Sequence, residues 1–587
     1  MAVAPSRDDR RIILHFDYDC FYASVFEAEQ PVLKTLPLAV QQKQIVVTCN
    51  YEARRRGLRK LQLIREARQI CPDVVIVLGE DLSKFRDVSK ALFLFLRSFV
   101  WGGNVERLGF DEVFLDVTEM IRYNVDLLNR HDLEHSFFHL DRQEPTVGFT
   151  YDATRVHGST YPGAAPSTAA ETAESAESAA LRTRLLVASH LAGFLRAELE
   201  HRKGYTATVG IATSKLLAKL AGSTHKPNNQ TTLLPPYVTV RDRSSNVHDF
   251  LDAHEIRQIP GLGSKLTAKL VSYLAGARAD GATPADRVTV RDVRLAPGMG
   301  PARLDRILGG PGAPRDIGAR VWGLINGVDN SEVAQTGDLP TQISIEDSYG
   351  RLDSLEAVRR ALDALAASLL RRMRTDLTEP DETGTESQPR TRWLARPRTL
   401  RLSTRPRSAN DAQSYQGNRI SRSAPVPSYV FHLDESVDAI AERLVQEVLL
   451  AMFRRLHPEK SGWNLRLMNV AVTNLVEAAG DRKQSSGRDI GKMFQSQGSR
   501  MDVVSDMQPS LLEGSNPSQT SLLTGSHGLA GGSPRDADPN PIVEEEEAAW
   551  EDSDEEESMP SEACGECGIL IPHFAREAHE LYHAVPD

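Results

Sequence analysis

Three carboxylates stand at the ends of apolar segments that have the character of β-strands. Asp17 closes the segment RIILHFD, and the adjacent pair Asp111 and Glu112 separates VERLGF from VFLDV. Strands that each deliver an acid at one end can hold two divalent cations about 4 Å apart. One cation then activates a hydroxyl nucleophile while the other neutralises charge on a triphosphate, which is the chemistry of phosphoryl transfer. The alternative is that each acid is an ordinary turn residue.

The elements around these acids alternate between strand and helix. Between residues 10 and 150, short apolar segments such as IVVTCN and PDVVIVLG alternate with amphipathic ones such as DLSKFRDVSKALFLFLRSF. This order is typical of an α/β layer with functional acids at strand ends. Residues 158–180 are small and polar and predict a disordered insertion. Residues 250–330 are expected to be helical, and residues 340–475 to form a second α/β unit.

Composition and charge exclude several classes of protein. The 587 residues suffice for three or four compact units, and no apolar run is long enough to cross a membrane. Five cysteines are too few for a disulfide framework, and the N-terminus has no apolar signal-peptide core, so the sequence predicts an intracellular protein. Ten carboxylates between Glu544 and Glu557 account for most of the net charge of −11. The remainder is nearly neutral and can present basic surfaces to nucleic acid.

The motifs that contain the acids resemble those of the Y family of DNA polymerases. FDYDCFYASV and GFDEVFLDV match its two acidic motifs, CNYEARRRG its triphosphate-gripping motif, and GIATSKLLAKLAG a further motif. The resemblance implies a DNA-directed DNA polymerase, a nucleotidyltransferase. It also implies that two Mg²⁺ ions, for which Mn²⁺ can substitute, are held by Asp17, Asp111, Glu112 and the carbonyl of Tyr18. Asp19 is expected to form local hydrogen bonds instead.

The resemblance also assigns residues to the incoming deoxynucleoside triphosphate. Tyr22 is at the position of the family's steric gate, a flat ring that leaves no room for a ribose 2′-hydroxyl. Tyr51, Arg54 and Lys215 are implied to contact the triphosphate, by a hydroxyl, a forked guanidinium and an ammonium respectively. Tyr22 could also be an ordinary aromatic core residue of a helix.

Within the family, the segment LAVQQKQIVVTCNYEARRRG resembles the iota subfamily. There the equivalents of Gln42, Lys43 and Ile45 narrow the roof over the templating base, so the resemblance implies error-prone translesion synthesis past damaged DNA. Two alternatives stay open. One is a bypass polymerase like the eta subfamily, and the other is a catalytically silent scaffold that binds DNA and ubiquitin.

The family's multidomain α/β right hand can be mapped onto the sequence. The implied domains are palm 1–33 and 96–248, fingers 34–95, helical thumb 249–335, little finger 340–475, a disordered acidic tail 476–560 and a zinc finger 561–587. In the thumb, IPGLGSKLTAKL has helix–hairpin–helix form, and Gly261 and Gly263 would let backbone amides approach a DNA phosphate. The little finger carries seven arginines from Arg390 to Arg407 and no acid among them. Those predicted to follow the backbone of primer-template DNA are Arg398, Arg401 and Arg405.

The C-terminus carries the spacing of a zinc site. Cys564 and Cys567 are followed, after eleven residues, by His579 and His583, one helical turn apart. Two thiolates and two imidazoles form a closed tetrahedral Zn²⁺ site, without which so short a segment could not fold. The segment resembles the ubiquitin-binding zinc fingers of the eta subfamily, which implies ubiquitin or a ubiquitinated sliding clamp as partner. It departs from them at Leu581, where that family has an aspartate.

One further segment is a candidate for recruitment. In GRDIGKMFQ, the apolar residues Ile490, Met493 and Phe494 have one-turn helical spacing, so they could dock into a sliding clamp. Solvated linker is the alternative. The implied function places the protein in the nucleus.

Overall fold

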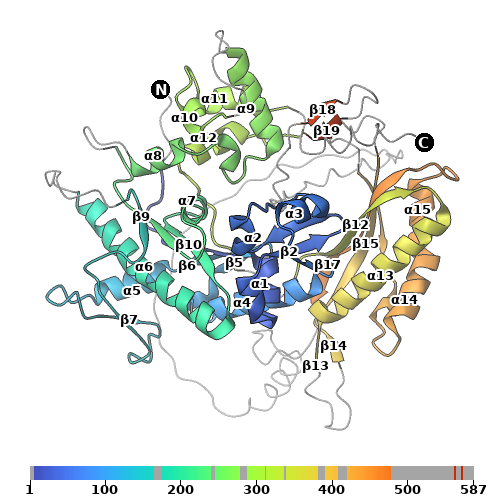
Figure 1. The fold of residues 1–587 in the computed structure, drawn as a ribbon, viewed down its shortest axis with the longest axis horizontal. Coiled ribbons are helices and arrows are strands. Elements are labelled where there is room, and N and C mark those ends of the chain that lie inside the picture. Colours follow the sequence, from blue (N-terminus) through green and yellow to red (C-terminus); the bar gives the residue numbers. More distant parts are fainter. Residues whose placement is uncertain are drawn as a thin grey trace, which may run out of the picture. The chain divides into compact units, whose positions relative to one another are not determined.

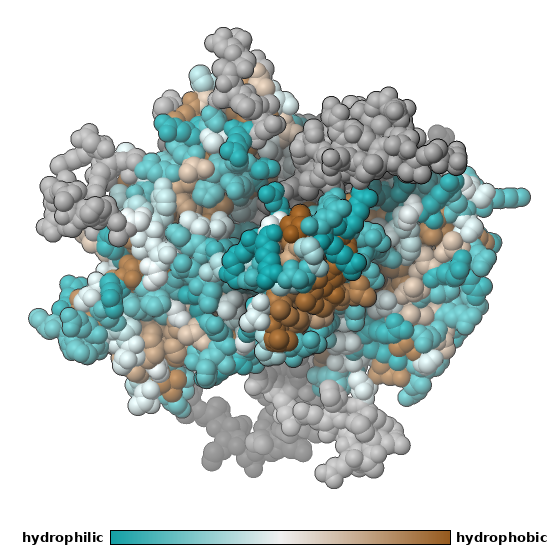
Figure 2. Space-filling view, in the orientation of Figure 1, coloured by the Kyte–Doolittle hydropathy of each residue, from teal (hydrophilic) through white to brown (hydrophobic). Residues whose placement is uncertain are grey.

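The computed structural model divides the chain into two compact units, Met1–Thr336 and Gly337–Asp587 (Figure 1). The residues that it describes are 6–163, 175–239, 245–277, 287–310, 312–335, 339–380, 391–407, 419–477, 561–563 and 570–572. In this part of the chain no helix combines the length and the apolar character that a membrane crossing requires. The face shown in Figure 2 is mainly hydrophilic, and apolar side chains gather near its middle.

The first unit is built on a six-stranded sheet with the order β5-β6-β1-β10-β11-β9. Its strands are β5 (Val105–Leu108), β6 (Glu112–Asp116), β1 (Ile13–Tyr18), β10 (Ala207–Ala212), β11 (Gln230–Leu233) and β9 (Ser159–Tyr161). The central strand β1 pairs antiparallel with both β6 and β10. Both β1 and β10 are buried along nearly their whole length because helices cover the sheet.

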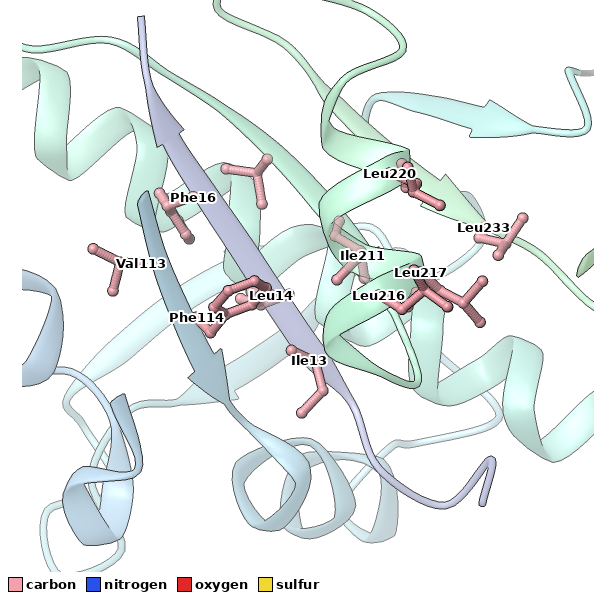
Figure 3. Close-up of a cluster of buried hydrophobic side chains, with 14 of the residues drawn as sticks. Ile13, Leu14, Phe16, Val113, Phe114, Ile211, Leu216, Leu217, Leu220 and Leu233 are labelled. Carbon is pink, nitrogen blue, oxygen red and sulfur yellow. The ribbon is translucent and has the colours of Figure 1, made fainter. Parts of the chain in front are cut away.

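Helices α6 (Ala176–Lys203) and α7 (Lys215–Gly222) pack against β10 and β11. Figure 3 shows Leu216, Leu217 and Leu220 of α7 turned toward the apolar residues of the strands. The helix comes unusually close to the sheet, since a Cβ on Gly210 would lie 1.8 Å from the carbonyl oxygen of Ala218. Glycine at position 210 is therefore what lets α7 lie directly on the strand that neighbours β1.

Residues 21–97 contain a separate three-stranded sheet, with the order β3-β2-β4. Its elements are α1 (Phe21–Glu29), η1 (Pro31–Thr35), β2 (Leu38–Gln42), β3 (Ile45–Cys49), α2 (Tyr51–Arg55), α3 (Ile64–Ile70), β4 (Val75–Leu78) and α4 (Ser83–Arg97). Connecting elements are η2 (Trp101–Gly103), α5 (Thr118–Asp126) and the hairpin β7 (Ser136–His139) and β8 (Gly148–Tyr151). A small core under the sheet includes Ala39, Val46 and Ala53.

The helical region predicted over 250–330 is present. It consists of α8 (Asn246–Asp252), η3 (Ile256–Gln258), α9 (Ser264–Ala277), α10 (Val290–Arg294), α11 (Pro301–Leu308) and α12 (Ile317–Ile325). Buried apolar residues such as Leu270, Leu304 and Val321 hold it to the core of the first unit.

The second unit contains the α/β fold predicted over 340–475. A four-stranded antiparallel sheet has the order β12-β17-β15-β16, formed by β12 (Ile343–Leu352), β17 (Leu465–Glu477), β15 (Ala395–Pro406) and β16 (Ile420–Pro425). The helical elements are α13 (Leu355–Leu377), η4 (Ser428–Phe431), α14 (Val437–Leu444), the π-helical turn η5 (Val445–Leu449) and α15 (Leu450–Leu456). Two short pairs complete the description, β13 (Thr378–Pro380) with β14 (Thr391–Trp393), and β18 (Ser561–Ala563) with β19 (Leu570–Pro572).

The structure corrects the predicted disordered insertion at 158–180. Residues 159–161 form β9, which pairs in parallel with β11, and α6 begins at Ala176 rather than near residue 181. Ser175 starts this helix because its hydroxyl oxygen accepts the amide hydrogen of Ser178 at 3.2 Å. Polar composition alone could not reveal a three-residue strand whose hydrogen bonds are supplied by its neighbour. Residues 164–174 lie outside the described residues.

Several predictions fall outside the described residues. These are nearly all of the acidic tail, the zinc ligands Cys564, Cys567, His579 and His583, and the clamp-binding residues Ile490, Met493 and Phe494. They stay predictions. The tail was predicted to begin at 476, whereas β17 continues through Glu477.

Candidate active site

The sheet brings the three predicted acids together. Asp17 of β1 lies directly opposite Glu112 of β6, so their side chains share a face of the sheet with Cβ atoms about 5 Å apart. Asp111 precedes Glu112 in the turn between β5 and β6, and its carbonyl oxygen accepts the amide hydrogen of Tyr18 at 2.8 Å. Gly109 adopts a φ of +64° that permits this tight turn. The acids therefore converge at one end of two neighbouring strands.

Lysines lie against these acids. Lys226 forms an ion pair with Asp17, and Lys219 Nζ lies 2.8 Å from Glu112 Oε2. His15, 2% exposed, places Nε2 3.7 Å from the same Glu112 oxygen. Among the residues that the structure describes, no group of three or more His, Cys, Asp or Glu side chains is drawn together closely enough to hold a metal ion. The lysines instead neutralise the acids.

The acids differ in how readily they ionise. Burial, together with the neighbouring charges of Asp17 and Glu112, raises the pKa of Asp111 to about 7. Burial also raises the pKa of Asp17, although Lys226 opposes the shift. Burial acts in the same direction on Glu112, but His15 and Lys219 outweigh it and lower the pKa of that carboxyl to about 2. Carboxylate oxygens of this kind are the ligands that a hard divalent cation such as Mg²⁺ prefers.

Asp19 was expected to form local hydrogen bonds, but its side chain bonds to residues far away in the sequence. It is 5% exposed; its Oδ1 accepts the hydroxyl hydrogen of Thr208 at 2.9 Å, and its Oδ2 accepts the amide hydrogen of Asn228 at 2.8 Å. Arg196 Nη2 donates to the side-chain oxygen of Asn228. These bonds hold the turn that follows Lys226 and so support the position of that lysine.

Two of the three predicted triphosphate ligands lie together at the start of α2. Asn50 caps this helix, since its side-chain oxygen accepts the amide hydrogen of Ala53 at 2.9 Å. The guanidinium of Arg54 lies over the ring of Tyr51, 4.7 Å from its centre, and its Nε donates to the carbonyl of Cys49 at 3.2 Å. Burial is the main cause of the raised pKa of the Tyr51 hydroxyl, to which the charges of Asp19 and Asp17 also contribute. The Tyr51 hydroxyl is thus close enough to Asp17 and Asp19 to respond to their charge.

The third predicted ligand, Lys215, is not placed as expected. Its Nζ lies 2.9 Å from each carboxylate oxygen of Glu106 and 3.2 Å from the carbonyl oxygen of Glu332, and the residue is 8% exposed. The lysines at the acids are Lys219 and Lys226, neither of which was assigned to the triphosphate from the sequence. The segment THKPNN, which matches a Lys-Pro-Asn turn common in the Y family, contained the signal for Lys226.

Two models of one protein family match the chain. The model described as the impB/mucB/samB family matches residues 16–223, and the model of that family's C-terminal domain matches residues 340–486. The chain belongs to this family. The family comprises Y-family polymerases, so the resemblance predicted from the sequence is confirmed.

Individual relatives agree with this assignment. The chain is similar to DNA polymerase iota of Homo sapiens, with 33% identity over 465 residues that cover 79% of this chain and 52% of the relative. DNA polymerase iota of Mus musculus is 32% identical over 476 residues, covering 81% of this chain and 55% of the relative. DNA polymerase eta of Drosophila melanogaster is 31% identical over 277 residues, 43% of this chain and 30% of the relative. The chain spans about half the length of the human and mouse relatives.

The sugar gate predicted for this Y-family chain has a rigid support. The ring of Tyr22 on α1 stacks on Phe85 of α4, with ring centres 4.1 Å apart and an interplanar angle of 18°. Phe110, next to Asp111 in the β5–β6 turn, lies 6.3 Å from Tyr22. Phe85 is only 1% exposed, so the ring of Tyr22 has a fixed side chain behind it and cannot shift toward the core.

The residues predicted at the template base lie at the β2–β3 hairpin. Gln42 ends β2, Ile45 begins β3, and Lys43 is in the turn with a φ of +52°. The side-chain nitrogen of Gln42 donates to the carbonyl of Gly79 at 2.6 Å, and the amide of Lys43 donates to Glu80 Oε1 at 3.1 Å. These bonds fix the hairpin on its neighbouring loop.

The helical region 246–325 contains two similar glycine turns, of which only the first was predicted from the sequence. Gly261 has a φ of +86°, and the amide of Leu262 donates to the carbonyl of Ile259 at 3.0 Å; Gly263 follows. The segment PGMG repeats this pattern, with Gly298 at a φ of +68° and the amide of Met299 bonded to the carbonyl of Ala296 at 3.0 Å. The second turn could have been predicted from the sequence, because PGMG at 297–300 resembles PGLG at 260–263.

The three predicted DNA-binding arginines all lie on β15. Arg401 and Arg405 are four residues apart and share one face of the strand, where both are partly exposed. Burial alternates in the opposite sense before and after Thr399, because Ala395 and Pro397 are buried before it and Leu400 and Leu402 after it. Arg398 is exposed. All three arginines therefore reach solvent, and their contact with DNA stays a prediction.

Proposed function

We propose that this protein is a magnesium-dependent, template-directed DNA polymerase that acts in translesion synthesis in the nucleus. The observation that carries the proposal is the pairing of Asp17 with Glu112 beside Asp111, with Tyr51 in the same electrostatic environment. The names of the relatives, DNA polymerases iota, eta and IV, support the same chemistry. A scaffold that only bound DNA and ubiquitin would have no use for this set of side chains.

The chain's own residues supply most of what nucleotidyl transfer requires. Two Mg²⁺ ions, held by the acids and the Tyr18 carbonyl, would activate the primer 3′-hydroxyl and neutralise the triphosphate. Arg54 and Tyr51 would bind and orient the triphosphate oxygens. Lys226, rather than Lys215, is the lysine that we assign to the triphosphate, because its ammonium lies at Asp17.

The direct test is primer extension by the full chain at varied Mg²⁺ concentration and pH. Because the pKa of Asp111 is about 7, its carboxyl is mostly protonated at pH 6 and mostly ionised at pH 8. A proton on this oxygen competes with a cation. We expect the half-saturating Mg²⁺ concentration to be about tenfold higher at pH 6 than at pH 8, and chelation to stop extension. Template-dependent extension that persists in chelator would rule out the metal site.

The iota-like hairpin leads to a proposal about fidelity. Gln42, Lys43 and Ile45 would narrow the space above the templating base, favouring a template purine in the syn form that pairs through its Hoogsteen edge. Replacing Gln42 and Lys43 by alanine is expected to make misinsertion less dependent on the template base. Misinsertion would be measured opposite each of the four bases; an unchanged pattern would refute the proposal. If the protein is instead an eta-like enzyme, the chain with Gln42 and Lys43 unchanged should copy past one particular lesion efficiently.

The C-terminal segment supports a proposal about recruitment. Cys564, Cys567, His579 and His583 would bind one Zn²⁺, and the folded finger would bind ubiquitin on a sliding clamp, with the segment around Ile490, Met493 and Phe494 as a further clamp contact. Replacing Cys567 by serine is expected to remove the zinc and ubiquitin binding while primer extension continues. Metal analysis and ubiquitin titration measure this; full zinc content in the variant would contradict the ligand set.

A further inference from the structure

The segment that follows the last thumb helix is fastened to the palm. We call residues 329–335 the strap. Arg11 donates through Nη2 to the carbonyl of Asp329 at 2.8 Å and through Nη1 to the carbonyl of Ser331 at 2.7 Å. The amide of Leu216, at the start of α7, donates to Asp329 Oδ2 at 3.0 Å. The beginning of the strap is thus bound to the chain before β1 and to the start of α7.

The ion pair of Lys215 and Glu106 holds the middle of the strap. Besides its two bonds to Glu106, Lys215 Nζ donates to the carbonyl of Glu332 at 3.2 Å. Glu106 Oε2 also accepts the amide hydrogen of Ala334 at 2.8 Å. The lysine therefore binds one strap residue and its partner carboxylate binds another. Lys215 and Glu106 thus neutralise each other, and each also forms a hydrogen bond to a backbone group of the strap.

The far end of the strap is bound to the loop before β5. Gln335 Nε2 donates to the carbonyl of Gly102 at 2.8 Å and to the side-chain oxygen of Asn104 at 3.0 Å. Within the strap, Val333 is 7% exposed and belongs to the core of the first unit. The chain is therefore fixed up to Gln335, and β12 of the second unit begins at Ile343.

We propose that Lys215 and Glu106 are positioning residues that fix the strap and thereby set the number of residues between the part of the chain fastened to the first unit and Leu339, which packs against the core of the second unit. This inference rests on the proposed function, because it assigns DNA binding to the sheet that carries Arg401 and Arg405. It gives Lys215 a role in retaining primer-template rather than in binding nucleotide. Both residues act through the strap and touch no substrate.

The physical consequence follows from tethering. Two DNA-binding units joined by a short tether bind cooperatively, because the second binds at an effective concentration that falls as about the −3/2 power of tether length. Releasing the strap beyond Ser331, which Arg11 still holds, would lengthen the stretch before Leu339 from three residues to seven, so binding of primer-template should weaken about threefold. Nucleotide binding should not change, since the acids, Tyr51 and Arg54 make no contact with the strap in the bonds described above.

The test compares Lys215→Met with Lys215→Arg in the full chain. Methionine keeps the length and apolar stem of lysine but cannot bond Glu106, whereas arginine keeps the charge. For Lys215→Met we expect a KM for primer-template about threefold higher, with kcat and the KM for dNTP unchanged. Hydrogen exchange at the Ala334 amide, whose hydrogen Glu106 accepts, should become at least about tenfold faster, and exchange at the Ser331 amide should change little. Lys215→Arg should restore both quantities toward those of the unaltered chain.

Two further variants make the outcome decisive. Lys226→Met should raise the KM for dNTP and leave strap exchange unchanged. If Lys215→Met fails to fold, Gln335→Ala loosens the same strap from its far end and should raise the KM for primer-template in the same direction. A rise in the dNTP KM of Lys215→Met with unchanged strap exchange would overturn the proposal, as would faster exchange with no change in DNA binding. Hydrogen exchange can be measured on a protein that has no activity. A wild-type chain without polymerase activity would therefore refute the proposed function, whereas the exchange data would still test the strap.

Discussion

Replacing Asp111 by asparagine is expected to reduce the rate of nucleotide insertion at least about a thousandfold, because the cluster loses a charged oxygen donor at the reacting centre. The same change should raise the melting temperature at pH 8. Burial and the charges of Asp17 and Glu112 raise the pKa of this carboxyl to about 7, so at pH 8 the folded protein carries an ionised group that the fold disfavours. A neutral amide of the same shape removes that penalty.

The measurement is single-nucleotide insertion together with a thermal melt. Asp116→Asn is the matched control, because Asp116 ends the same strand β6 and accepts hydrogen bonds only from Thr118 among those that the structure describes. It should retain insertion activity and gain no stability. An Asp111→Asn protein that inserts nucleotides at the wild-type rate would remove Asp111 from the active site.

Replacing Tyr22 by alanine is expected to raise insertion of ribonucleotides relative to deoxyribonucleotides about a hundredfold. The ring of Tyr22 stacks on the ring of Phe85, with the ring centres 4.1 Å apart. In the wild-type protein it therefore cannot move aside for a ribose 2′-hydroxyl. Alanine removes the obstacle without altering the acids or the triphosphate ligands.

Paired insertion assays with each sugar measure this selectivity. Tyr22→Phe keeps the ring and its stacking and should discriminate as well as wild type. If Tyr22→Ala still rejects ribonucleotides, then the aromatic residue is only a packing residue of α1, which was the alternative from the sequence.

The acids could be predicted from the sequence because strand-end carboxylates inside two recognisable motifs leave few other roles. The register of the strands that carry them could not be predicted, because the pairing of Asp17 with Glu112 depends on which strands become neighbours. Lys215 shows why motif position is a weak guide to contact. Lys215 and Lys219 lie one helical turn apart on α7, yet one bonds Glu106 and the other Glu112. Only the placement of α7 on the sheet decides between them.

The arginines of β15 could be predicted as a basic group from the sequence, because no acid lies among them. Their exposure could not, since the alternation of buried residues reverses within the strand around Thr399. β9 was missed for a different reason. Its three residues contain no apolar pattern, and it is a strand only because β11 offers a parallel edge. Long-range partners of this kind have no local signal.

Lys219 and Lys226 place positive charge directly beside Glu112 and Asp17. If these acids hold a divalent cation as proposed, each lysine must give up its carboxylate partner, so the net affinity for the cation is the difference between two sets of contacts. A triphosphate brings negative charge with which the released ammonium groups can pair. Binding of nucleotide and binding of metal would then each strengthen the other.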